Sequence, residues 1–233
     1  MNWRVPLSGT IILVLGACAS HVVEVPPDGS TSANSWRDVP QASTRDGGIA
    51  HLCPYSAHQA YTARHVVLDF EFGRLWLIPV NWGQGDQGGT LFPLMLDARR
   101  DLALGCSNKP FPRWFERAAG PPNVGDKVHV PVYDWFKKGA PRNEIELTVA
   151  EVVGGTIRFE SSPNPGSSGA CILDDENRIV AIASGGLPGL TSFGMAVWGK
   201  WGEIPPEWRD SEKYGWLGAS EAAKGCAAEA LEK

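Results

Sequence analysis

The chain has 233 residues, of which 43% are hydrophobic and 20% are charged, and its formal net charge is −5. That length suits one large all-β domain or two small domains, and the acidic balance argues against a nucleic-acid partner. Many turns are expected from 27 glycines and 18 prolines, which favours a fold rich in β-strands.

Residues 1–17 have the pattern of an export signal, with Arg4 ahead of a short apolar stretch, Thr10–Leu15. The next tetrad, Leu15-Gly16-Ala17-Cys18, resembles the lipobox of bacterial lipoproteins. This resemblance implies cleavage before Cys18, acylation of that cysteine and attachment to a membrane of a bacterial cell envelope. Because Ala19 is not acidic, we expect the periplasmic face of the outer membrane rather than the inner membrane. A plain secretory signal with an incidental cysteine is the alternative.

Residues 18–48 are rich in Pro, Ser, Asp and Gly and show no sustained periodicity, which predicts a flexible tether. Residues 49–233 are expected to form the folded domain. There, apolar and polar residues alternate as in half-buried strands. The predicted strands are Val66–Gly73, Arg74–Val80, Leu91–Leu96, Lys127–Val132, Glu144–Val149, Thr156–Glu160, Ala170–Leu173, Ile179–Ala183 and Ser192–Trp198.

An irregular stretch at 109–125 separates two β-rich halves, at about 49–110 and 122–200. Many short strands in two halves suit barrels or a sandwich. In the C-terminal segment, 201–233, small apolar residues from Ala219 to Leu231 fall on one helical face behind a potential cap, Ser220. The sequence therefore predicts an all-β fold with one short helix at its end.

The turn 164–173, NPGSSGACIL, carries two candidate nucleophiles. Ser168 is followed directly by Gly169 and preceded by Gly166, so substrate and backbone amides can approach it closely. Ser167 lacks this symmetry. An ordinary turn is the alternative interpretation of the stretch.

A serine hydroxyl needs a base, and the base needs an acceptor that holds its tautomer. His65 lies just before an apolar strand and is the candidate base, with His58 as a competitor. Asp101 precedes a short apolar segment and is the candidate acceptor. A solvated carboxylate paired with Arg99 or Arg100 is the alternative for Asp101.

Taken together, the three stretches resemble the motifs of trypsin-like (chymotrypsin-fold) serine peptidases. Thr62-Ala-Arg-His65 is similar to their Thr-Ala-x-His, Asp101-Leu-Ala-Leu104 to their Asp-[Ile/Leu]-Ala-Leu, and Gly166-Ser-Ser168-Gly-Ala170 to their Gly-x-Ser-Gly-[Gly/Ala]. The order His, Asp, Ser is also that of the family. The likeness covers about residues 47–198.

The resemblance implies two antiparallel β-barrels packed side by side, with a catalytic crevice between them. Ser168 would attack a peptide carbonyl, His65 would transfer its proton, and Asp101 would orient His65. The amides of Gly166 and Ser168 would form the oxyanion hole. The family acts on polypeptides and needs no cofactor, and we expect no metal site either.

The resemblance also places the specificity pocket. Ser184, Gly185 and Gly186 resemble the family segment that pairs with the substrate and walls this pocket. In family members that cut after Lys or Arg, an acid lies six positions before the nucleophile, where this chain has Ser162. An uncompensated cation in such a pocket is costly, so we expect cleavage after uncharged, small or medium apolar residues.

Ser167 stands where the family usually has an Asp that a freed N-terminus would bind, so that activation device is not expected. Val66 follows His65 where many members have a cysteine, which leaves Cys53 without its family partner. Four cysteines remain besides Cys18, and they allow three pairings. Pairing within each half, Cys53 with Cys106 and Cys171 with Cys226, is the expectation.

Two other functions remain open at this point. The chain is either an active peptidase, or a catalytically silent homologue of one, or an envelope binding module. The last would use tryptophans near the C-terminus, Trp198, Trp201, Trp208 and Trp216. The simpler interpretation is that these tryptophans pack the C-terminal segment onto the second barrel.

Overall fold

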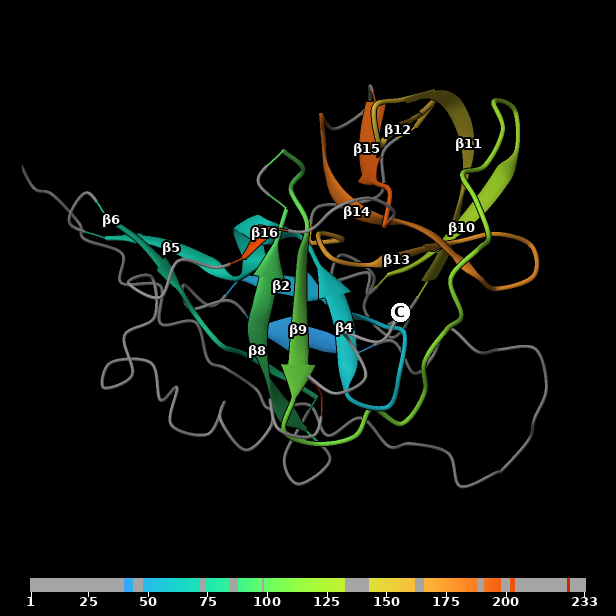
Figure 1. Cartoon of the computed structure of the whole chain (residues 1–233). Helices are drawn as coiled ribbons and strands as arrows, with labels where there is room; N and C mark the ends of the chain where they lie inside the picture. The colour runs from blue at the N-terminus through green and yellow to red at the C-terminus, as the bar shows by residue number, and fades with distance from the viewer. Residues whose placement is uncertain are drawn as a thin grey trace, which may run out of the picture. The chain divides into compact units, whose positions relative to one another are not determined.

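The computed structural model describes residues 40–43, 48–71, 74–83, 88–97, 99–132, 143–161, 166–187, 191–197, 202–203 and 226. These residues form a fold of β-strands (Figure 1). The strands of the first half are β1 (Gln41–Ser43), β2 (Ile49–His51), β3 (Cys53–Pro54), β4 (Gln59–Thr62), β5 (Leu68–Glu71), β6 (Arg74–Leu77), β7 (Val80–Trp82), β8 (Gly89–Leu96) and β9 (Ala103–Ser107). Those of the second half are β10 (Lys127–Val132), β11 (Asn143–Val153), β12 (Thr156–Phe159), β13 (Cys171–Leu173), β14 (Ile179–Leu187) and β15 (Thr191–Met195). The C-terminal segment adds β16 (Gly202–Glu203).

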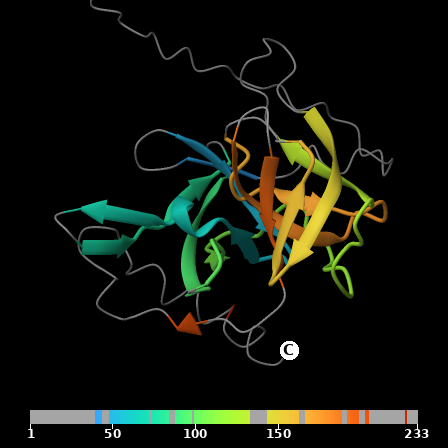
Figure 2. The same cartoon turned by 90° about the horizontal axis from the view of Figure 1, so that it is seen from above.

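The second half closes into a six-stranded antiparallel barrel in the order β10-β11-β12-β15-β14-β13 (Figure 2). Alternation along its strands explains this closure. Val128 and Val130 of β10 are buried, as are Leu147 and Val149 of β11, whereas the residues between them face outward or are partly exposed. Inward side chains of period two fill a small barrel without a lumen. The strand β14 is longer than predicted and continues through Gly185 and Gly186.

The first half forms a sheet in the order β2-β1-β7-β8-β9-β4-β3, with β16 added to β8. Its first strand, β1, pairs with both β2 and β7. The first barrel therefore begins before residue 49, inside the segment 18–48 that the sequence assigned to the tether. A separate two-stranded ribbon, β5–β6, extends from this half on the side away from the second barrel (Figure 1).

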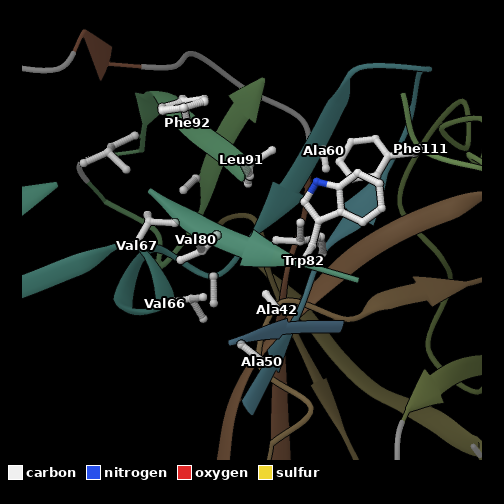
Figure 3. Packing of buried hydrophobic residues seen from close by; sticks show 14 residues of the cluster. Ala42, Ala50, Ala60, Val66, Val67, Val80, Trp82, Leu91, Phe92 and Phe111 are labelled. Carbon is white, nitrogen blue, oxygen red and sulfur yellow. The ribbon is translucent and has the colours of Figure 1, made fainter. Parts of the chain in front are cut away.

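A hydrophobic cluster fills the first barrel, as Figure 3 shows. Val66 and Val67 both point into it beside Val80, so these two neighbouring residues cannot belong to one alternating strand. Residues Arg64–Val66 form a 3₁₀-helix, η2, and the strand predicted from Val66 begins only at Leu68.

A third cluster of buried residues joins the two barrels. It combines Cys53, Tyr61, Leu102 and Leu104 from the first barrel with Cys171, Ile179 and Ile182 from the second and Phe115 from the connecting segment. A disulfide, Cys53–Cys171, crosses this contact. The expected pairing within each barrel is therefore wrong, because buried residues at the barrel contact place Cys53 closer to Cys171 than to Cys106.

The second disulfide, Cys106–Cys226, ties the C-terminal segment to the first barrel. Gln59 Nε2 also donates a hydrogen bond to the Cys226 carbonyl at 2.9 Å, and β16 pairs with β8. Where it is described, this segment thus lies on the first barrel, not on the second as expected. Cys226 is helical, but the remainder of the predicted C-terminal helix and the four tryptophans lie outside the described residues.

Among the described residues, none of the helices has the length and apolar character needed to span a bilayer. The predicted signal, residues 1–17, and Cys18 lie outside the described residues.

Candidate active site

His65 lies on η2, directly after β4, and two features hold it there. The neighbouring Val66 is buried in the first-barrel core, and the amides of Val66 and Val67 donate to the carbonyls of Ala63 and Arg64 at 3.0 and 3.1 Å. The His65 side chain itself remains 51% exposed. The core therefore anchors the backbone of the turn while leaving the imidazole accessible.

Asp101 binds His65 through both of its carboxylate oxygens. Oδ2 accepts a hydrogen bond from Nδ1 of His65 at 2.6 Å, and Oδ1 accepts the backbone N–H of His65 at 2.9 Å. A carboxylate only accepts, so the proton of the neutral ring lies on Nδ1 and the lone pair lies on Nε2. This is the tautomer that a general base needs.

Asp101 is mostly buried, with a side chain 23% exposed. Burial alone would raise the pKa of its carboxyl group. Hydrogen bonds from His65 and Ser184, together with the charge of His65, outweigh that effect and lower the pKa below its usual value. Asp101 is therefore ionised at neutral pH and can stabilise an imidazolium at His65.

The loop before Asp101 is held by a buried ion pair. Asp97 Oδ1 accepts hydrogen bonds from the backbone N–H groups of Arg99 and Arg100 at 2.8 and 3.0 Å. Its Oδ2 accepts a hydrogen bond from Arg100 Nε at 2.7 Å. Arg100 also donates to the carbonyl of Ala196 in the second barrel. Arg100 thus binds the carboxylate of Asp97, while Asp101 binds His65 and Ser184.

Ser168 lies in a tight turn between the two barrels. Gly166 and Gly169 of this turn have φ angles of 92° and 85°, a region that favours glycine. A Cβ on Gly169 would lie 2.0 Å from the carbonyl oxygen of His51 and 2.4 Å from Thr62 Oγ1. Close packing of the turn against the first barrel therefore requires Gly169, whereas Gly166 is favoured by its φ angle.

Hydrogen bonds fix the turn from both sides. The amide of Gly169 donates to Ala183 of β14 at 2.7 Å, and the carbonyl of Ser168 accepts the amide of His51 of β2 at 2.8 Å. The turn thus has one partner in each barrel.

Ser184 connects the acid to the serine. Its hydroxyl donates to Asp101 Oδ2 at 2.6 Å, and its carbonyl accepts the hydroxyl of Ser168 at 3.5 Å. The structure therefore brings His65, Asp101, Ser184 and Ser168 into one hydrogen-bonded chain across the two barrels. In this arrangement the Ser168 hydroxyl donates to Ser184, and direct contact of Ser168 Oγ with His65 Nε2 stays a prediction.

The competing base, His58, lies elsewhere on the first barrel. Its Nδ1 bonds to the carbonyl of Ser107 at 3.1 Å, and the amide of Ser107 donates to the His58 carbonyl at 2.7 Å. Among these described contacts of His58 there is none with Asp101 or Ser168.

The stretches expected to line the specificity pocket are described in part. Ser184 is buried, Gly185 is exposed, and both continue with Gly186 along β14. The adjacent strand β15 places Ser192 opposite Gly186, and the buried Ser192 hydroxyl donates to the carbonyl of Ser161 at 2.7 Å. Ser162 lies outside the described residues. The described parts of this wall carry no charged side chain.

Sequence reasoning missed two contacts at the site. It assigned Ser184 to the pocket wall but not to Asp101, and it did not connect His51 with the serine turn, although His51 Nδ1 bonds to the carbonyl of Gly166 at 2.9 Å. Both contacts join residues far apart in the chain. No local pattern around either residue signals them.

Comparison with solved structures identifies the architecture. The chain resembles the Rv3671c protease from M. tuberculosis in its active form (TM-score 0.56, 17% identity, 68% of this chain and 75% of that one). It also resembles a Glu endopeptidase (0.57, 14%, 72% and 89%) and a serine protease of human pathogenic astrovirus (0.53, 18%, 74% and 92%). No protein-family model matches the sequence, and no curated protein matches it. The chain therefore has the two-barrel fold of trypsin-like serine proteases, as its motifs predicted.

Proposed function

We propose that this chain, with its trypsin-like two-barrel fold, is a serine endopeptidase that uses Ser168, His65 and Asp101. Ser168 Oγ attacks the peptide carbonyl while His65 Nε2 takes the hydroxyl proton, and the amides of Gly166 and Ser168 bind the resulting oxyanion. His65 then gives this proton to the leaving amine as the C–N bond breaks. Water, deprotonated by His65, then attacks the acyl carbon, and the bond from that carbon to Ser168 Oγ breaks as His65 returns the proton to Oγ.

The observation that carries this proposal is the bond between Asp101 Oδ2 and His65 Nδ1 at 2.6 Å. It leaves the lone pair of His65 on Nε2, on an exposed imidazole, and the lowered pKa of Asp101 keeps the orienting carboxylate charged. The Ser184 bridge supports the assignment further, because it links this pair to the Ser168 turn. Catalytic hydrogen bonds to a nucleophile often tighten only when substrate binds.

Covalent labelling with a fluorophosphonate probe tests the proposal. We expect wild-type protein to be labelled, Ser168→Ala to lose the label, and Ser167→Ala to keep most of it. His65→Ala should label far more slowly than His58→Ala, which is the matched histidine control. Equal labelling of wild type and Ser168→Ala contradicts the mechanism, and a folded wild type that neither labels nor hydrolyses casein favours a catalytically silent homologue.

We further propose that the enzyme cuts after uncharged, small or medium apolar residues. The supporting observation is that the described wall residues, Ser161, Ser184 and Ser192, carry no charge, and the hydroxyls of Ser184 and Ser192 already donate to Asp101 and Ser161. A buried cation or carboxylate of a substrate would lack a charged partner there. A peptide library randomised at the residue before the cut measures this preference, and a preference for Lys, Arg or Glu would contradict it.

Attachment to the outer membrane through an acylated Cys18 completes the proposal, and its support is the lipobox-like sequence. Cys18→Ser should release the protein from the membrane fraction or block its processing, whereas Ala19→Asp should redirect it to the inner membrane. Fractionation followed by mass spectrometry of the N-terminal peptide measures both. A processed Cys18→Ser protein that stays in the membrane contradicts the anchor.

A further inference from the structure

His51 is a buried histidine at the end of β2 that none of the steps above uses. Only 2% of it is exposed, and its Nδ1 lies 2.9 Å from the carbonyl oxygen of Gly166. A carbonyl can only accept a hydrogen bond, so Nδ1 carries the proton and donates. Gly166 is the residue whose amide is proposed to bind the oxyanion.

The backbone of His51 contacts the same turn. Its amide donates to the carbonyl of Ser168 at 2.8 Å, and its own carbonyl accepts the hydroxyl of Thr62 at 3.0 Å. Gly169 packs so closely on that carbonyl that a Cβ would stand 2.0 Å from it. One residue of the first barrel therefore supports Gly166, Ser168 and Gly169 of the second.

The side-chain bond matters because Gly166 is conformationally free. Its φ angle of 92° lies in a region that glycine enters at little cost and leaves as readily. An oxyanion hole works only when its amides are already aimed at the developing charge. The bond from His51 holds the carbonyl of Gly166 in place. It therefore limits the backbone rotation of Gly166 that would turn its own N–H group away from the oxyanion.

We propose that His51 is a positioning residue that holds the Gly166–Gly169 turn in the conformation required for oxyanion binding. This inference rests on the proposed function and deepens it. The histidine acts through its Nδ1–H on Gly166 and does not touch the substrate. Losing that donor lowers kcat and leaves substrate binding nearly intact.

Three substitutions separate the donor from the bulk of the side chain. His51→Asn keeps an N–H group near the place of Nδ1, His51→Gln moves it one bond further out, and His51→Leu removes it. His58→Leu is the matched control, because His58 Nδ1 also bonds a backbone carbonyl, that of Ser107, away from the Ser168 turn. Thermal unfolding of each variant establishes that it is folded.

Two measurements are made on these proteins: kcat and KM on a peptide substrate, and amide hydrogen exchange of residues 166–170 followed by mass spectrometry. We expect His51→Leu to lower kcat by about 10- to 100-fold with KM within about 3-fold, since losing an entire oxyanion-hole donor costs about 100- to 1,000-fold. Exchange at 166–170 should rise in parallel. His51→Asn should restore both values, and His58→Leu should change neither.

Unchanged kcat and unchanged exchange in His51→Leu would overturn the inference, as would an equal loss in His51→Asn and His51→Leu. If His51→Leu does not fold, the comparison of His51→Asn with His51→Gln decides, and equal kcat values for these two overturn the inference. A turn that loosens in His51→Leu, in a protein whose wild type hydrolyses no substrate, supports the positioning and contradicts the proposed function.

Discussion

The two barrels differ in how they end their sheets. The second closes on itself through the pairing of β10 with β13, so each of its six strands has two neighbours. The first runs from β2 at one end of its sheet to β3 at the other. Unpaired edge groups are a liability that proteins cover. Here the amide of His51, at the end of β2, donates to Ser168 of the other barrel.

The open sheet of the first barrel and the closed sheet of the second contribute differently to the site. His65 and Asp101 both come from the first barrel and meet through short loops, η2 and the turn that Asp97 caps. The serine turn belongs to the closed barrel, yet residues more than 100 positions away bind it or the strand that follows it: His51 contacts Gly166, and Cys53 forms a disulfide with Cys171. The first barrel thus supplies the His–Asp pair and also a support for the serine turn.

The largest expected effect comes from removing the disulfides. One of them joins the two barrels, and the other joins the C-terminal segment to the first barrel. Their sequence separations of 118 and 120 residues are nearly equal. Loss of either crosslink should therefore lower the free energy of unfolding by about 5 kcal/mol. Only Cys53→Ala/Cys171→Ala should also lower kcat, because that bridge joins the barrels beside the serine turn. Denaturant unfolding and steady-state kinetics measure both, with Cys106→Ala/Cys226→Ala as the control, and equal kcat losses would argue against this distinction.

A somewhat smaller effect is expected where the serine turn meets the first barrel. Gly169→Ala would strain a φ angle of 85° and drive a Cβ into the His51 carbonyl. We expect a loss of about 4 kcal/mol in the free energy of unfolding, together with loss of labelling at Ser168. Gly120→Ala is the control, since no atom lies within 4 Å of its Cβ position. If both variants are equally stable, the turn has room for a methyl group at position 169, which contradicts the close contact with the His51 carbonyl.

The ion pair that reaches from the first barrel to the second provides the third test. Arg100→Leu leaves the buried Asp97 carboxylate without its partner and removes the bond to Ala196. The free energy of unfolding should fall by about 3 kcal/mol. Arg158→Leu breaks the exposed pair of Arg158 with Glu151 within the second barrel and should cost less than about 1 kcal/mol. Urea unfolding compares the two, and a similar small loss in each would mean that the barrel contact does not depend on Arg100.

The smallest effect concerns the acid side of the pH–stability curve. Burial raises and hydrogen bonding lowers the pKa of Asp101, with a net lowering in the folded state. The resulting stability is fully present above the unfolded pKa of about 3.9 and is lost as the pH falls below it toward the lower folded value.

Ser184→Ala removes one of the hydrogen bonds that lower the pKa of Asp101. It should reduce stability at pH 6 by about 1 kcal/mol and make the decline between pH 4 and pH 2 shallower. Unfolding followed over this pH range measures the slope. A slope identical to that of the wild type would mean that Ser184 contributes nothing to the ionisation of Asp101.

The sequence by itself determined the features that depend on local pattern. Alternation in Lys127–Val132 and Thr156–Phe159 marks real strands because each has one face toward a core. The segments around His65, Asp101 and Ser168 were found from motifs whose residues are neighbours in the chain. The fully buried strand β9, Ala103–Ser107, has no alternation. The sequence accordingly indicated only a short apolar segment after Asp101, Leu102–Leu104, and no strand.

Contacts between distant parts of the chain became known from the folded structure alone. The three possible disulfide pairings differ in which buried cysteines meet, and packing at the barrel contact selected Cys53–Cys171 and Cys106–Cys226. Tertiary contacts also place Cys226 on the first barrel, where Gln59 binds its carbonyl. The bonds of His51 to Gly166 and of Ser184 to Asp101 span 115 and 83 residues. No local periodicity encodes such contacts, because they join residues that are far apart in the chain and meet only in the folded protein.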